Sequence, residues 1–121
     1  MREYVEKRSI IRNGSAAVDV VNVSFSKQHN QTAITFSFTK NFIDHFMKCD
    51  HVKVSFDTEE KKIYFERCEY GDDSGWKIYP SKTSTRMYVK FRADKITFWQ
   101  KFIGKKHIGY SEKDGAWIIA E

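Results

Sequence analysis

One order of structural elements occurs twice in this chain, and the repetition restricts the folds open to it. Each copy has a strand with alternating apolar and polar side chains, then a short amphipathic helix, then a hairpin. The first copy places these elements at residues 34–38, 41–47 and 51–66, and the second at residues 87–91, 94–103 and 107–120. A unit of this size cannot bury its own apolar face, so the two copies are expected to pack against each other.

The apolar positions of the two copies are in register, which favours a true internal repeat over two unrelated strands. A shift of 53 residues places Phe36 on Val89 and the helix cap Asn41 on the cap Asp94. The second copy contains one additional residue after the helix, so a shift of 54 aligns the hairpin at 51–66 with the hairpin at 107–120. We therefore predict an α+β, mostly β fold of eight or nine strands and two short helices. The duplicated units would form a barrel-like core with pseudo-two-fold symmetry.

The length of 121 residues fits a single domain, residues 1–121, in which four segments can be distinguished. An Asn13-Gly14 turn lies between two strand-like runs, and this dipeptide is a strong signal for a hairpin. We expect an N-terminal β-hairpin that is added at the barrel edge. The segments are the N-terminal hairpin at 1–31, the first repeat at 32–68, a connecting segment at 69–82 and the second repeat at 83–121.

The order of the elements, a strand followed by a short helix and a hairpin, resembles that of the AbrB/SpoVT-type swapped-hairpin regulators. The resemblance is strongest at Arg86-Met87-Tyr88-Val89, the strand that leads into the helix. Small phage and prophage proteins with two such blocks in one chain look similar, including the link YGDDSGWKIYPS. The family's glycine before the arginine is Thr85 here, and the first block has Ala33 at the arginine position. The resemblance implies a barrel that presses basic loops onto duplex DNA, and Arg86 is the one site residue that it carries over.

Positive charge is concentrated in the second half of the chain. The net charge is +5, and residues 71–121 hold ten basic and six acidic residues, against eleven and ten before them. Arg86, Lys90, Arg92 and Lys95 are the predicted phosphate contacts, Lys82, Lys105 and Lys106 are predicted to lie at the periphery, and Trp76, Tyr79 and Tyr88 are possible aromatic contacts. An ordinary solvated face is the alternative interpretation, because surface lysines commonly serve only solubility. We predict a non-catalytic, transcription-linked protein that binds duplex DNA.

Other functional classes have weaker support in the sequence. The alternative is a protein-interaction module that binds and inhibits or adapts a host protein through its tyrosine- and tryptophan-rich surface. His45, Cys49, His51 and Cys68 match no standard zinc spacing, so two small packed thiols and no metal are expected. Phosphate-loop, nucleophile-elbow and metalloprotease motifs are missing, and we expect neither an enzyme nor a cofactor. No apolar run reaches membrane-spanning length, and a cytoplasmic protein with reduced thiols is expected, its oligomeric state left open.

Overall fold

The computed structural model describes residues 17–28, 31–69, 71–72, 74–94 and 96–121. In this part of the chain, nine strands form one antiparallel sheet, and two short helical segments accompany them. The strands are β1 Ala17–Gln28, β2 Gln31–Thr39, β3 His51–Asp57, β4 Lys62–Arg67, β5 Trp76–Lys77, β6 Tyr79–Pro80, β7 Arg86–Arg92, β8 Gly104–Ser111 and β9 Ala116–Ala120. The helical segments are α2 Lys40–Phe42, continued by a π-helical turn, η1, at Ile43–Met47, and α3 Ile96–Gln100. The prediction of a mostly β fold is confirmed.

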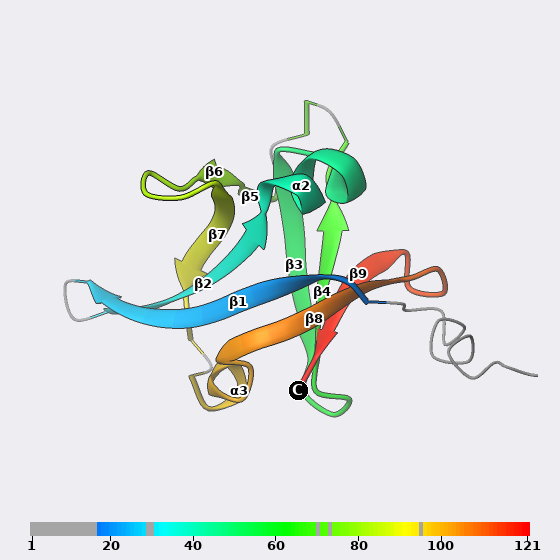
Figure 1. The fold of residues 1–121 in the computed structure, drawn as a ribbon. Coiled ribbons are helices and arrows are strands. Elements are labelled where there is room, and N and C mark those ends of the chain that lie inside the picture. Colours follow the sequence, from blue (N-terminus) through cyan, green and yellow to red (C-terminus); the bar gives the residue numbers. More distant parts are fainter. Residues whose placement is uncertain (1–16, 29–30, 70, 73, 95) are drawn as a thin grey trace, which may run out of the picture.

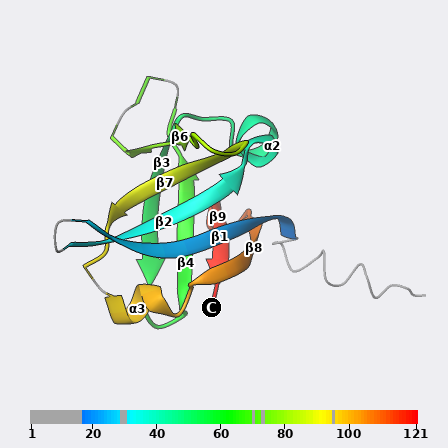
Figure 2. The same ribbon diagram turned by 60° about the vertical axis from the view of Figure 1, so that its left-hand side comes forward.

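The sheet curls until it almost closes on itself. Its strand order is β5-β3-β4-β9-β8-β1-β2-β7-β6, so that β5 and β6 lie at its two ends. These two strands are separated in the chain only by Ile78, which is buried. The segment 76–80 therefore connects the two edges of the sheet. Figures 1 and 2 show the resulting barrel-like shape, with α2 and α3 at opposite ends.

The pairing between the two halves has the register that a two-fold axis requires. In the β2–β7 pair, Phe36 lies opposite Val89, which is 53 positions further along the chain. In the β4–β9 pair, Tyr64 lies opposite Ile118, 54 positions further. Exchange of the two halves maps each of these pairings onto itself. The geometry is thus pseudo-symmetric, while the origin of the halves by duplication stays a prediction.

Strand β1 corrects the prediction of a hairpin at the barrel edge. It pairs with β2 on one side and with β8 on the other, so it lies inside the sheet. The expected partner strand at residues 3–12 and the Asn13-Gly14 turn lie outside the described residues. In the other half, the segment 76–80 takes the corresponding place, because β5 pairs with β3 and β6 pairs with β7. The predicted connecting segment therefore contains two strands of the barrel.

The two repeated hairpins end in equivalent loops. Lys61 N–H donates to the Asp57 carbonyl (2.9 Å), and Gly115 N–H donates to the Ser111 carbonyl (2.8 Å). Lys61 and Gly115 both adopt left-handed backbone conformations, with φ of 58° and 63°. Glycine takes this conformation without steric cost, whereas lysine is strained there.

Aromatic side chains fill the barrel, and each short helix packs against the opposite half. Phe36, Phe38 and Phe65 are buried at the centre, with Phe36 and Phe65 in edge contact at 5.2 Å. At one end, Trp99 of α3 contacts Phe56 of β3, with 5.0 Å between the ring centroids. At the other end, α2 and η1 cover Trp117 of β9, with Phe42 at 4.9 Å and Phe46 at 6.0 Å. The helices thus lock the two halves together.

The N-cap of the first helix lies two residues before the predicted cap, Asn41. The Thr39 hydroxyl accepts a hydrogen bond from Phe42 N–H (3.0 Å), so Thr39 rather than Asn41 is the N-cap. Threonine serves here because its oxygen satisfies a backbone N–H that lacks a helical partner.

Candidate nucleic-acid interface

The outer face of β7 carries the predicted basic residues. Strand alternation places Val89 in the core and Tyr88 and Lys90 on the other face. On the neighbouring strand β2, Thr35 lies opposite Lys90 and Ala33 lies opposite Arg92. Directly paired residues share a face of the sheet, so small side chains of β2 adjoin long basic side chains of β7.

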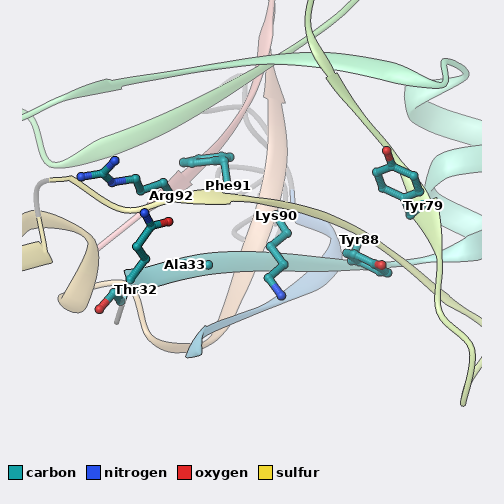
Figure 3. A pocket seen from close by; sticks show the side chains of 8 residues that line it. Thr32, Ala33, Tyr79, Tyr88, Lys90, Phe91 and Arg92 are labelled. Atoms are coloured by element: carbon teal, nitrogen blue, oxygen red, sulfur yellow. The ribbon is translucent and has the colours of Figure 1, made fainter. Parts of the chain in front are cut away.

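This difference in side-chain size leaves a groove of about 380 Å³ along β2, β6 and β7. Its lining residues are Gln31, Thr32, Ala33, Tyr79, Tyr88, Lys90, Phe91 and Arg92, and none of these described residues is acidic. Tyr79 stacks on Tyr88 at 5.9 Å and closes one end of the groove. Figure 3 shows Lys90 between Tyr88 and Arg92 along the strand. The groove offers two cationic groups and two phenol hydroxyls, all of which can donate hydrogen bonds to phosphate oxygens.

The charge of the sheet is divided between its two parts. Strands β8, β1, β2 and β7, which are neighbours, contain six lysine or arginine residues and one aspartate. Strands β3, β4 and β9 contain three basic and two acidic residues. The single aspartate, Asp19, accepts hydrogen bonds from the Val20 N–H (2.7 Å) and the Thr39 hydroxyl. The neighbouring strands β8, β1, β2 and β7 therefore form the positive side of the barrel.

Arg86 is engaged within the sheet. Its Nε donates to the Ser37 hydroxyl (2.7 Å), and its Nη2 donates to the carbonyls of Ser37 (2.6 Å) and Val20 (3.3 Å). The guanidinium thus crosses β2 and reaches β1, which ties three strands together. A fork of several donors suits arginine for this role, and a lysine could not reproduce it. Phosphate contact by Arg86 stays a prediction, but in the structure its guanidinium hydrogen-bonds to β1 and β2.

The other predicted contacts are distributed across the positive side. Arg92 is exposed and forms an ion pair with Asp94 (3.3 Å). Lys105 is exposed opposite Asn22, whereas Lys106 is half-buried and shares the inner face of the sheet with the buried Val21, so Lys106 does not lie beside Lys105 on the outer face. Lys82 is exposed in the turn before β7, and Lys95 lies outside the described residues. The structure therefore brings Lys90 and Arg92 together in the groove and places Lys105 on the far side of β1.

Sequence reasoning missed the contribution of β2 to the groove. Gln31, Thr32 and Ala33 line it because β2 pairs with β7. The repeat offers a partial signal, because a two-fold axis can pair equivalent strands, as it does for β2 and β7, although it leaves the equivalent strands β3 and β8 apart. A second cavity, of about 220 Å³, lies beside the groove and is lined mainly by aromatic residues, including the exposed Trp76.

The candidates for metal and acid–base chemistry do not converge. Among the described residues, no three histidine, cysteine, aspartate or glutamate side chains lie close enough together to hold a metal ion. Burial raises the pKa of the Cys49 thiol above its ordinary value of 9.0. A hydrogen bond from His51 (3.2 Å) lowers the pKa of Asp50. A raised thiol pKa disfavours the thiolate, which is the form that reacts or binds metal.

Comparisons with protein-family models, curated proteins and solved structures gave no match to this chain. None of the helices in the described ranges has both the length and the apolar composition needed to cross a bilayer.

Proposed function

We propose that this protein binds duplex DNA through the phosphate backbone, with the β2–β7 groove as the centre of the contact. The observation that carries the proposal is the groove itself, where Lys90 and Arg92 lie beside two tyrosines and none of the described lining residues is acidic. Phosphate contacts supply most of the affinity of nonspecific DNA binding. Arg92 would exchange its exposed ion pair with Asp94 for a phosphate, and exposed pairs of this kind contribute little stability.

The spacing of the positive side chains fits a duplex. Lys105 on β8 and Tyr88 on β7 belong to one cross-strand row, which passes through Asn22 and Ser37. Three strand spacings of roughly 4.8 Å separate the ends of this row by about 14 Å. The major groove of B-DNA is roughly 12 Å wide, so Lys105 at one end of the row, and Lys90 next to Tyr88 at the other, can meet phosphates on opposite strands. The small polar side chains on the outer faces of β1 and β2 would then face the major groove of the DNA, between the two phosphate backbones.

The resemblance to swapped-hairpin regulators supports the same proposal. Each helix packs on the opposite half, with Trp99 on Phe56 and Phe46 on Trp117, as expected for two interleaved units. We accordingly propose a single-chain form of such a regulator, of the phage or prophage type, that acts in the cytoplasm on transcription without catalysis. Arg86, the residue that carries the resemblance, would stabilise the DNA-binding sheet rather than bind phosphate.

The proposal is tested by fluorescence anisotropy with a labelled 30-base-pair duplex of random sequence. The variant Lys90→Gln/Arg92→Gln should raise Kd by roughly tenfold or more, which corresponds to about 1.4 kcal/mol. The control Lys53→Gln/Lys113→Gln removes the same charge from β3 and from the β8–β9 turn, and it should change Kd less than twofold. Equal losses in both variants would show a general charge effect and contradict a dedicated groove.

The second candidate function is an adaptor or inhibitor of a host protein. The observation that favours it is the exposure of Trp76 and Tyr79, each 48% accessible, because exposed aromatic side chains often anchor protein interfaces. Tyr79→Ala would distinguish the two functions. It should weaken DNA binding only by the loss of one phenol hydrogen bond, whereas it should abolish capture of a protein partner.

A further inference from the structure

The second cavity lies at one end of the barrel, next to α3. Its lining residues are Val54, Phe56, Trp76, Phe91, Arg92, Asp94 and Trp99. Trp76 stacks on Phe91 at 5.0 Å with an interplanar angle of 27°, and Phe91 contacts Trp99 at 5.8 Å. Trp76 and Phe56 nevertheless remain 48% and 37% exposed. The cavity therefore presents aromatic surface that the described part of the chain does not cover.

This aromatic cavity is continuous with the basic groove. Phe91 and Arg92 line both, the former from the inner face of β7 and the latter from the outer face. A ligand that extends across the end of β7 could therefore contact Lys90 in the basic groove and Trp76 in the aromatic cavity at the same time. Such a ligand would meet cationic groups in the basic groove and aromatic side chains in the cavity.

The size and charge of the cavity restrict its ligand. At about 220 Å³ it is smaller than the roughly 300–1,000 Å³ of pockets that enclose drug-sized ligands, so it suits a single ring system. Aromatic residues can also hold cations, but the Arg92 guanidinium at the rim would repel a cation and offsets the charge of Asp94, the one acidic residue in the described lining. A planar, uncharged ring attached to an anionic group fits both the aromatic surface and the neighbouring lysine.

We propose that this cavity holds one unpaired nucleobase, stacked on Trp76, of a nucleic acid whose backbone lies in the basic groove. The inference rests on the proposed function and extends it. The protein would bind most tightly where a duplex meets an unpaired nucleotide, such as an overhang or a bulge. Stacking of a base on an aromatic side chain is tolerant of base identity, so no sequence preference is implied.

The test compares three labelled DNA hairpins in anisotropy titrations at one salt concentration, each closed by a non-nucleotide linker so that the loop contains no unpaired base. One hairpin is blunt, one carries a single unpaired 3′ thymidine, and one carries an abasic 3′ residue with the same phosphate. Stacking should make the thymidine hairpin bind roughly 5- to 150-fold more tightly than the other two. Trp76→Ala should remove this ratio, and Trp76→Phe should retain part of it.

Tyr110→Ala serves as the control, because Tyr110 is an exposed aromatic residue (40% accessible) that packs on Trp117, outside the cavity lining. It should preserve the ratio, and circular dichroism should show that each variant folds. Equal affinity of the wild type for all three hairpins, or a ratio that survives Trp76→Ala, would overturn the inference and leave the proposed function intact. Failure of all three hairpins to bind would instead refute the proposed function.

Discussion

Arg86 should matter more for stability than for DNA binding, and Arg86→Met tests this. Methionine keeps most of the side-chain length but removes the three hydrogen bonds to Ser37 and Val20. At about 1 kcal/mol for each bond, with the 3.3 Å bond at the low end, the free energy of unfolding should fall by about 2–3 kcal/mol. For a chain of 121 residues this corresponds to a Tm lower by roughly 8–12 °C.

The assay is urea unfolding followed by tryptophan fluorescence, with DNA affinity measured well below the transition. Arg86→Lys should recover less than half of the lost stability, because an ammonium group cannot donate in a fork. Arg92→Gln, with only its exposed pair to Asp94 to lose, should remain within about 0.5 kcal/mol of the wild type. If Arg86→Met changed stability by less than about 0.5 kcal/mol but weakened DNA binding strongly, Arg86 would be a phosphate contact.

Three further predictions concern the frame of the barrel. Gly75→Ala should destabilise it by about 1–3 kcal/mol in urea unfolding, because the new Cβ would lie 2.6 Å from the Val52 carbonyl oxygen. Gly115→Ala should cost about 1 kcal/mol, whereas Lys61→Gly, at the equivalent position, should cost nothing or stabilise slightly; equal losses would contradict the strain in the left-handed conformation. Because burial raises the pKa of Cys49, the folded chain should hold less thiolate than the unfolded chain at pH 8, and Ellman's reagent should label native Cys49 more slowly, with equal rates as the contrary result.

The alternation of apolar residues predicted most of the buried strand positions, although Phe56, on the predicted apolar face of its strand, is 37% exposed. Phe36, Val89 and Ile63 are buried as expected, and the two hairpins form where turn residues separate the alternating runs. Alternation identifies the inner face of a strand but not its neighbours in the sheet. The position of β1 between β8 and β2 was therefore not predictable from its own residues.

Other features depend on contacts between distant residues. β5 and β6 have two residues each, which is too short for any periodicity, and they become strands only because β3 and β7 pair with them. The task of Arg86 depends on Val20, 66 positions away. Charge, by contrast, was readable from the sequence, and the structure gathers Lys90 and Arg92 in one groove as their spacing on a strand predicts.

The central claim, that the basic groove binds DNA phosphates, is tested most directly by the dependence of DNA affinity on salt concentration. The slope of this dependence reports the number of phosphate contacts. If Lys90, Arg92, Lys105 and Lys82 each neutralise a phosphate, the slope of log K against log salt should be about −3 to −4. Lys90→Gln/Arg92→Gln should make this slope shallower by about 2, since each lost contact removes about one unit. An unchanged slope in that variant, or no duplex binding even at low salt, would contradict the account.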